Sequence, residues 1–416
     1  MVMSASVCSK CIEDEYLKEI VDRDGERGKC SVCNEKRRVF RTEELGELLE
    51  PIIREHFSQG QEVRRFSEDD DKDWWEQEGD DLNWVVEEVL GQYFDFQNKI
   101  VNAVIDAEYV DPRDGDVPFF DRSANYVEKP ISHYLKQTEW RNVLQELKHS
   151  RRFFSPTAGA FFSELFTGVD QLQYWDVTGK KKDSVVVSLP KGSKVFRARI
   201  CDSVDALKAV YQNPFLNVGP PPPEKARAGR MNAEGVVVFY GATDPNTCIA
   251  EMRPPLGGDT AVITLETTKL LRLLDFTRLS KCLGELSYFQ TDFREETERF
   301  KFLRHLGRLI SRPIIPGNEA DYLITQTMTE YLAHIHEKSF DGILFNSTQR
   351  KEGINVVIFP RTKESSLCLS FPLKYSDGSL QLFSTRSISY EHYEKRMRLE
   401  GDSVVPDYDW FDFSDE

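Results

Sequence analysis

Four cysteines near the start of the chain constrain its fold more than any other feature. They form two Cys-x2-Cys pairs, Cys8 with Cys11 and Cys30 with Cys33. Each pair can place two thiolates on one tight turn, and two such turns complete the tetrahedral sulfur shell that Zn²⁺ prefers. Because this shell has no open coordination position, the spacing predicts a structural zinc site in a small module, residues 1–41. The alternative is four unrelated buried thiols.

The same module ends in a basic stretch, Lys36 to Arg38 followed by Arg41. It is either a solvated face or a surface that contacts a phosphate backbone or an acidic partner. The whole chain has a formal net charge of −16, which on average repels phosphates. We therefore expect no nucleic-acid partner except at this basic zinc module.

The remaining cysteines indicate a reducing compartment. Cys201, Cys248, Cys282 and Cys368 are scattered singly and form no disulfide framework. Residues 1–10 lack the apolar segment of a signal peptide, and no apolar run is long enough to span a membrane. We expect a cytoplasmic protein with no membrane partner.

A chain of 416 residues exceeds one ordinary core and predicts several domains. An amphipathic helix is expected at 42–57, and apolar residues recur at helical spacing after Asp81, at 131–148 and after Ser155. These segments predict an all-α domain over 42–176. Within it, the acidic segment Ser67 to Asp81 is expected to be a solvated loop.

The pattern changes near Lys180, where short β-branched and aromatic runs begin to alternate with helical segments. Asp244 and Pro245 predict the start of a helix that carries Glu251. The fold class is therefore α+β, with a mixed α/β domain at 177–365 and an extension or tail at 366–416. Strands are expected at 184–189, 194–200, 235–241, 259–267, 270–276, 342–345 and 353–359, and further helices at 202–212, 294–311 and 322–337.

Arginines in this half of the chain suit a pyrophosphate. Arg197 and Arg199 are two apart on one expected strand and so share a face. Arg230 lies in a polar turn that also contains Asn232. Guanidinium groups bind phosphate oxygens bidentately. The structural alternative for these arginines is pairing with nearby acids.

Other residues suit the nicotinamide ribose of NAD. Tyr240 ends an apolar strand and can stack on a base or a pyridinium, and Glu251 can stabilise an oxocarbenium-like ribosyl centre. Since nicotinamide leaves NAD as a neutral molecule, one carboxylate suffices where ordinary glycosidases need two. Ser347, which follows Asn346 after a strand, can orient the substrate. The alternatives are a packing tyrosine, a surface glutamate and a turn-capping serine.

The stretch Val195 to Pro360 resembles the RES-domain family, the toxin enzymes of bacterial toxin–antitoxin pairs. The resemblance implies a fold similar to ADP-ribosyltransferases and degradation of NAD by hydrolysis or phosphorolysis. It places Glu251, Tyr240, Arg230 and Ser347 on catalytic positions, and we assign NAD contacts to Arg197, Arg199, Asn232 and Asn346. The motifs include Val195-Phe-Arg-Ala-Arg, Gly229-Arg-Met-Asn, Val237-Val-Phe-Tyr-Gly-Ala, Thr247-Cys-Ile-Ala-Glu-Met-Arg-Pro and Asp341-Gly-Ile-Leu-Phe-Asn-Ser.

The N-terminal half resembles the HEPN-like helical domains that are fused upstream of some RES domains. An active HEPN ribonuclease needs Arg-x4–6-His, and the spacing from Arg141 to His149 is too long. We therefore expect a non-catalytic, regulatory domain. The expected partners are NAD, an antitoxin or regulatory protein, and a second copy of the chain in a homo-oligomer.

Three functions remain open at the level of sequence. The leading one is an NAD glycohydrolase or phosphorylase acting as an intracellular bacterial toxin or antiphage defence effector. The second is an ADP-ribosyltransferase that modifies a protein or RNA. The third is a non-catalytic binding protein whose RES-like half is inactive.

Overall fold

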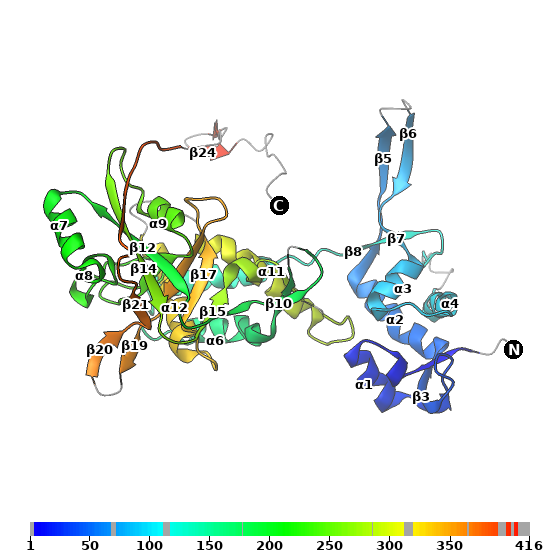
Figure 1. Ribbon diagram of the computed structural model, residues 1–416. Helices are drawn as coiled ribbons and strands as arrows, with labels where there is room; N and C mark the ends of the chain where they lie inside the picture. The colour runs from blue at the N-terminus through cyan, green and yellow to red at the C-terminus, as the bar shows by residue number, and fades with distance from the viewer. Residues whose placement is uncertain are drawn as a thin grey trace. The chain divides into compact units, whose positions relative to one another are not determined.

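The computed structural model describes residues 4–67, 72–110, 117–176, 178–284, 286–311, 319–363, 366–389, 397–400 and 403–406. Figure 1 labels its helices and strands. The contacts within the chain divide it into two units, each built from two sequence segments. The first joins Met1–Val187 with Leu274–Phe340, and the second joins Ser188–Leu273 with Asp341–Glu416. Residues 274–340 thus group with the N-terminal part, although they lie inside the expected domain 177–365. The fold is mixed α+β, as the sequence predicts.

The cysteine module is a three-stranded antiparallel sheet with one helix. The sheet order is β1 (Ser6–Cys8), β3 (Lys36–Arg41) and β2 (Glu26–Lys29), and η1 (Ser9–Cys11) is a short 3-10 turn. Helix α1 (Glu15–Asp24) begins at Asp14, whose side chain accepts the Leu17 N–H at 2.8 Å. Leu17 and Val21 are buried on its inner face, so α1 covers a core that continues into the next helices.

Three helices complete this first core. They are α2 (Thr42–His56), α3 (Leu82–Leu90) and α4 (Gln97–Ala107). Leu45, Leu49 and Ile53 of α2 are fully buried in a cluster that also contains Val7. A Cβ on Gly46 would lie 2.4 Å from the Ala103 carbonyl carbon, so the glycine permits the close crossing of α2 and α4.

Residues 42–176 are not all-helical, contrary to the sequence expectation. The short strands β4 (Phe57–Gln59), β8 (Asn125–Glu128) and β7 (Asp80–Asp81) form one sheet, and β5 (Glu62–Ser67) pairs with β6 (Lys72–Gln77). The expected loop Ser67 to Asp81 is therefore wrong for β6 and β7. Strand β6 pairs with β5 across a hairpin, where Arg65 lies 3.3 Å from Glu76, and β7 pairs with β8. The acidic composition of the segment gave no sign of this pairing.

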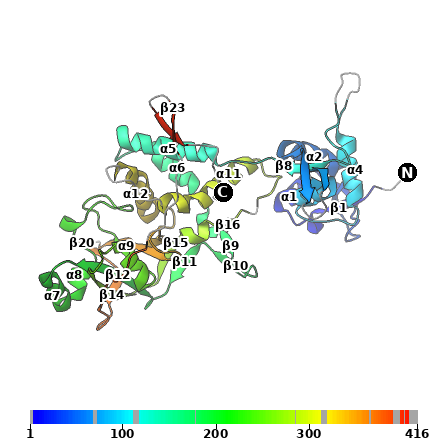
Figure 2. The same ribbon diagram turned by 90° about the horizontal axis from the view of Figure 1, so that it is seen from above.

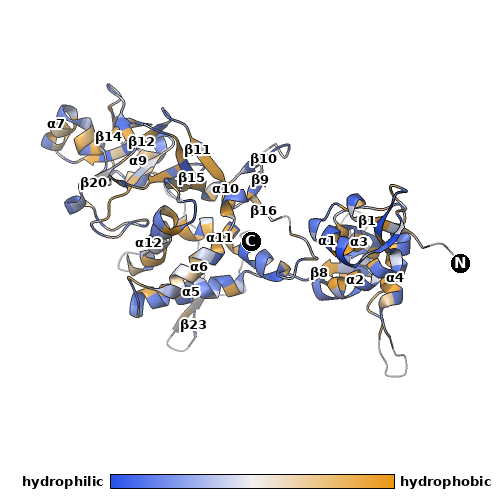
Figure 3. Cartoon of the chain, turned by 90° about the horizontal axis from the view of Figure 1, so that it is seen from below, coloured by the Kyte–Doolittle hydropathy of each residue, from blue (hydrophilic) through white to orange (hydrophobic). Residues whose placement is uncertain are grey.

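A second group of helices contributes to the first unit. Figure 2 shows α5 (Tyr134–His149) and α6 (Pro156–Leu165) beside α11 (Phe293–Ser311), and α12 (Leu323–Glu330) contacts α5 before the π-helical turn Tyr331–Ile335. Hydrophilic and hydrophobic residues alternate along α5 (Figure 3). On its buried side, the Trp140 ring lies 6.3 Å from Phe161 and 5.9 Å from Phe302. The amphipathic periodicity thus predicted α5 correctly.

The second unit is built on a nine-stranded sheet. The sheet begins with β11 (Val186–Leu189) and β15 (Leu271–Asp275), the two strands in which the chain passes from one unit to the other. The sheet continues with β17 (Gly342–Asn346), β18 (Ile354–Ile358), β13 (Phe239–Ala242), β12 (Lys194–Cys201), β14 (Asp259–Thr267) and β21 (Leu373–Tyr375), while β22 (Gln381–Ser384) also pairs with β14. The expected strand 235–241 is shorter, since only Phe239–Ala242 pairs.

Short elements complete the chain. The helices are α7 (Val204–Gln212), α8 (Pro214–Val218), α9 (Pro245–Met252) and α10 (Phe276–Leu279). The small sheets are β9 (Gln173–Trp175) with β10 (Lys182–Ser184) and β16 (Cys282–Leu283), β19 (Arg361–Lys363) with β20 (Ser366–Ser370), and β23 (Met397–Glu400) with β24 (Ser403–Pro406). Of the extension or tail expected at 366–416, residues 390–396, 401–402 and 407–416 lie outside the described residues. Among the helices that the structure describes, none is long and apolar enough to cross a membrane.

Candidate active site

The helix that carries Glu251 is fixed at its first turn. Asp244 caps α9, accepting the Thr247 N–H at 3.0 Å and the Thr247 hydroxyl at 2.6 Å, while Pro245 occupies the first helical position. Arg350 lies 2.7 Å from Asp244 and donates to the Thr247 hydroxyl at 2.9 Å. Partial burial raises the pKa of Asp244, but the hydrogen bonds from Thr247 outweigh it and hold the pKa below its usual value.

Cys248 anchors the same helix to the sheet. Its thiol donates to the Phe196 carbonyl at 2.9 Å, and it packs with Ala198, Ala242 and Val262. Burial raises the pKa of Cys248 to about 12, so the thiol stays protonated and is not a nucleophile at neutral pH. Glu251 follows one turn later on the same side of α9.

The Glu251 carboxylate is held by two side chains from other elements. The Ser347 hydroxyl donates to Glu251 Oε1 at 2.6 Å, and Asn355 Nδ2 donates to the same oxygen at 2.8 Å. The Ser347 oxygen also accepts the N–H groups of Gln349 and Arg350 at 3.1 and 3.2 Å. Its single hydroxyl hydrogen is therefore directed at the carboxylate. Within the described residues, Glu251 Oε2 accepts no hydrogen bond, which leaves it for a ligand.

The loop that carries Ser347 is fastened to α9. Its ends meet where the Ser347 N–H donates to the Gly353 carbonyl at 2.8 Å. A Cβ on Gly353 would lie 2.7 Å from Thr247 Oγ1, so a glycine is needed for this approach. At the other end of the helix, Arg253 Nε donates to Gln349 Oε1 at 3.1 Å. Helix and loop thus position the carboxylate and its donor together.

Tyr240 belongs to a second hydrogen-bonded group. Its hydroxyl donates to Asn232 Oδ1 at 2.9 Å and accepts the Met231 N–H at 2.8 Å. The backbones of Gly229 and Asn232 pair with each other, which makes Arg230 and Met231 the central residues of a tight turn. A Cβ on Gly229 would lie 2.8 Å from Asn232 Oδ1 and 2.9 Å from the Tyr240 hydroxyl. The turn therefore packs directly on the tyrosine.

The two groups share one face of the sheet. In the antiparallel pair of β13 and β18, Tyr240 lies opposite Val357 and Ala242 lies opposite Asn355. Residues directly opposite project to the same face, and diagonal neighbours are within reach of long side chains. Tyr240 is therefore a diagonal neighbour of Asn355, which holds Glu251.

Arg197 and Arg199 project to the other face. Ala198 between them packs with Cys248 under α9, and side chains alternate along a strand. Arg197 Nε donates to the Val218 carbonyl at 2.9 Å, Nη1 donates to the Tyr240 carbonyl, and the guanidinium lies 5.6 Å from the Phe239 ring. Burial lowers the pKa of Arg197 to about 10, which still leaves it charged. The structure brings Arg197 together with α8 and the Tyr240 backbone, not with Glu251.

Arg199 likewise donates to the Asn217 carbonyl of α8.

Comparison with known proteins assigns part of the chain to a family. Residues 196–373 match the family model of the RES domain. The C-terminal half contains a RES domain. This confirms the resemblance seen in the sequence, and RES is a family associated with NAD-related toxins. No curated protein and no solved structure matches the chain, so similarity to the ADP-ribosyltransferase fold stays a prediction.

Within the RES domain, the structure brings only some of the sequence-predicted residues into contact with one another. Glu251 and Ser347 are in contact, and Tyr240 contacts Asn232. Asn346 is exposed at the end of β17. The catalytic and NAD-binding roles of all these residues stay predictions. The sequence interpretation missed Asn355, whose signal was a single polar residue inside the apolar strand Ile354–Ile358.

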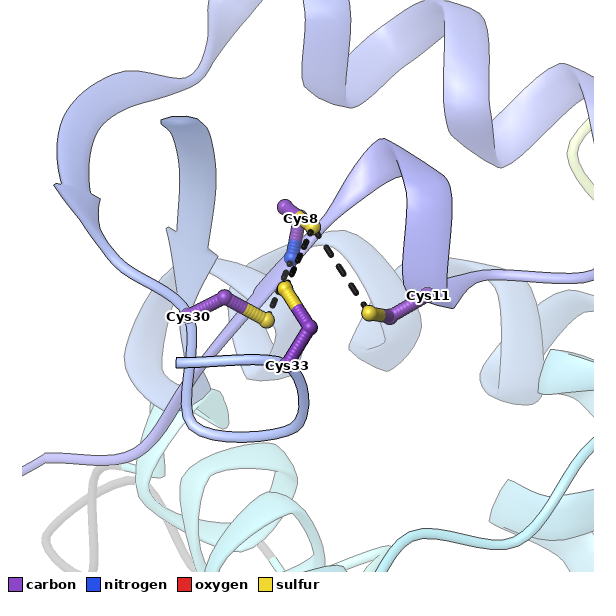
Figure 4. A group of neighbouring side chains, drawn as sticks. All are labelled: Cys8, Cys11, Cys30 and Cys33. Atoms are coloured by element: carbon purple, nitrogen blue, oxygen red, sulfur yellow. Dashed lines mark hydrogen bonds between the residues drawn. The ribbon is translucent and has the colours of Figure 1, made fainter. Parts of the chain in front are cut away.

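Outside the RES domain, the four paired cysteines converge (Figure 4). Their Sγ atoms all lie within 4.8 Å of one another, and Cys8 Sγ is 3.7 Å from those of Cys11 and Cys33. Bonds of about 2.3 Å to a tetrahedral zinc give sulfur separations of about 3.8 Å, so the donor set fits. Burial raises the pKa of Cys30, but main-chain N–H groups of Cys33, Val32 and Cys8 lower it to about 7. This cluster can hold a metal ion.

Proposed function

We propose that the RES domain cleaves the bond between nicotinamide and ribose in NAD, by hydrolysis or phosphorolysis. The observation that supports this most directly is the Glu251 carboxylate, which Ser347 and Asn355 orient through Oε1 while Oε2 accepts no hydrogen bond within the described residues. A fixed carboxylate with one available oxygen suits the stabilisation of a developing positive charge, because it needs no reorganisation during the reaction.

The chemistry requires little else of the protein. The carbon–nitrogen bond breaks with its electron pair going to the pyridinium nitrogen, so nicotinamide leaves neutral. The ribosyl carbon becomes cationic, and Glu251 stabilises it. Water or phosphate then forms the new carbon–oxygen bond; water passes its released proton to Glu251 or solvent. The products are nicotinamide with ADP-ribose or its 1″-phosphate.

Tyr240 and Arg230 are assigned supporting roles in this proposal. Tyr240 shares the sheet face with Asn355, so we assign its ring to stacking on the nicotinamide. Arg230 lies at the centre of the turn that packs on Tyr240, and its guanidinium suits the diphosphate. Since Arg197 and Arg199 project to the sheet face that does not meet α9, we assign the diphosphate first to Arg230.

Product analysis tests the activity. Purified full-length protein is incubated with NAD labelled in the adenosine, with and without phosphate, and nicotinamide and labelled products are separated. We expect nicotinamide release that falls at least about 100-fold in Glu251→Gln, which keeps the size and the Ser347 contact but removes the charge. Glu224→Gln, an exposed position, serves as the matched control. Intact NAD under both conditions, or label found on a macromolecule, would contradict the proposal.

In the cell, we propose a cytoplasmic toxin or defence effector, because loss of NAD halts growth. Induced expression in bacteria tests this. Growth and cellular NAD should fall with the wild-type protein and stay normal with Glu251→Gln at the same protein level. Normal NAD in arrested cells would contradict the proposal.

For the N-terminal module, we propose that Cys8, Cys11, Cys30 and Cys33 hold a structural Zn²⁺. The support is the convergence of four thiols and the N–H groups directed at Cys30, since hydrogen bonds to a sulfur favour its thiolate form. A closed shell of four thiolates contributes folding energy and no catalysis.

A further inference from the structure

The cysteine module contains a groove of about 1160 Å³ that the proposed function does not use. Its floor is the pair of strands β2 and β3, whose side chains here are Arg27, Lys29, Lys36, Arg37 and Arg38. The groove also borders η1 and α1, and all of its lining residues lie within the first unit. It is therefore a feature of one folded module.

The strands that line the groove place like charges opposite each other. Arg27 is the direct cross-strand partner of Arg38, and Lys29 is that of Lys36. Like charges at directly opposite positions destabilise a sheet. Lys10 at the rim adds another cation. The module folds despite this repulsion, and a bound polyanion would remove it.

Few of these cations are neutralised within the protein. Among the described residues, Lys10, Arg27, Lys29, Lys36 and Arg37 form no ion pair. The buried Arg37 Nε has no hydrogen-bond acceptor.

The remaining polar groups of the groove are already engaged. Arg38 donates to the carbonyls of Asp22 and Arg23 at 2.7 Å, and Lys18 pairs with Glu15. Asp22, the one carboxylate among the described lining residues, accepts the Ser9 hydroxyl at 2.6 Å. The cations of the groove that form no ion pair among the described residues can therefore bind an anionic ligand.

The lining distinguishes a nucleic acid from an acidic protein. The lining residues that the structure describes include no purely apolar and no aromatic side chain, whereas protein interfaces depend on buried apolar and aromatic anchors. Nucleic-acid interfaces are more polar and much more positively charged. We propose that this groove binds the phosphate backbone of a nucleic acid. Among the described lining residues there is no aromatic side chain that could stack on bases, so contacts of the cations with phosphates account for the binding.

The site explains how a chain of net charge −16 can bind a polyanion. The repulsion of the whole molecule acts at long range and is screened by salt within about 8 Å at physiological ionic strength. The groove acts at contact distance. At very low salt, where the repulsion is not screened, the affinity for nucleic acid should therefore be lower than that of a basic protein. The affinity should still fall as the salt concentration rises, because the groove contacts phosphates.

The test compares two triple variants of the full-length protein. Arg27→Ala, Lys29→Ala and Lys36→Ala together remove exposed cations of the groove, while Lys180→Ala, Lys181→Ala and Lys191→Ala remove the same charge at exposed positions elsewhere. Anisotropy of labelled mixed-sequence RNA and DNA reports affinity. We expect the groove variant to bind at least about tenfold more weakly than the control, with a salt slope reduced by about three.

A further variant guards against misfolding. Lys29→Arg with Lys36→Arg keeps the charge and should bind like the wild type. Equal affinity of the two alanine variants overturns the proposal. So does a poly-glutamate peptide that competes as well as RNA, because it would identify a site for acidic proteins. Nicotinamide release, measured on the same samples, is independent of either result.

Discussion

At the scale of single residues, the candidate site depends on the hydrogen bonds that hold the Glu251 carboxylate in place. Two of these contacts meet at Oε1, from Ser347 and Asn355. A hydrogen bond to a charged group contributes about 1.5–3 kcal/mol. Removing one donor therefore leaves the carboxylate present but less well fixed.

Ser347→Ala should lower the rate of nicotinamide release between about tenfold and 100-fold at nearly unchanged KM, because each 1.4 kcal/mol of lost transition-state stabilisation is about a factor of ten. Thr348→Ala, at the exposed neighbouring position, is the control and should behave like the wild type. Steady-state kinetics measure both. An unaltered kcat in Ser347→Ala would show that the contact does not support catalysis.

Residue identity alone predicted part of this site. Glu251 and Ser347, which are in contact, were predicted from the sequence because a carboxylate can stabilise a cationic ribosyl centre and a hydroxyl can orient the substrate. Asn355 was missed, since a polar residue in a buried strand acquires meaning only when its partner is known. Arg197 and Arg199 were expected to share a face, and they do, but which face meets α9 is decided by sheet packing and not by local spacing.

At the scale of elements, the helix α9 depends on its cap. Asp244→Ala should destabilise the protein by about 1–2 kcal/mol, the usual cost of losing a side-chain cap, and it also removes the ion pair with Arg350. Urea unfolding measures the change. Asp205→Ala on α7, which caps nothing and pairs with Lys208 only at 3.9 Å, should stay within about 0.5 kcal/mol.

The pKa of Asp244 sets a pH dependence for the same element. Because the folded-state pKa is lowered, its contribution is present above the unfolded value of about 3.9 and is lost as pH falls through the lower folded value. The stability difference between wild type and Asp244→Ala should therefore shrink on acidification below about pH 4. A difference that stays constant down to the acid limit would exclude this linkage.

The turn at Gly229 is the second element that can be tested. Gly229→Ala forces a Cβ against Asn232 and the Tyr240 hydroxyl, and overpacking of this kind costs about 1–3 kcal/mol. Gly159→Ala in α6 meets nothing within 4 Å and should stabilise the helix instead. Thermal unfolding and nicotinamide release are measured for both, and equal effects would contradict the packing argument.

Elements with local signals were predicted well. Helices were expected after Asp81 and Ser155 and at Asp244, and each of these side chains caps its helix by accepting a main-chain N–H of the first turn. Strands β6 and β7 lie in the segment that was expected to be a loop, because each is stabilised by a partner strand and not by its neighbours in sequence. Local chemistry therefore predicts where helices begin, but non-local pairing is invisible to it.

At the scale of the whole molecule, the first core crosses a predicted domain limit. Val7, Leu17 and Val21 of the cysteine module pack in the same cluster as Leu45 and Leu49 of α2. The hydrophobic core therefore runs without interruption across the predicted domain boundary between residues 41 and 42. Since metal binding to a structural site is coupled to folding, loss of the metal should loosen the helices as well as the module.

Chelation tests this coupling. Purified protein should hold about one equivalent of zinc, and Cys30→Ser should lose it while Cys282→Ser, outside the cluster, retains it. After metal removal, hydrogen exchange should accelerate in residues 1–41 and also in α2 and α4, because they complete the core that the module covers. Faster exchange confined to residues 1–41 would show that α2–α4 fold without the module, and that the sequence-based limit is an energetic boundary after all.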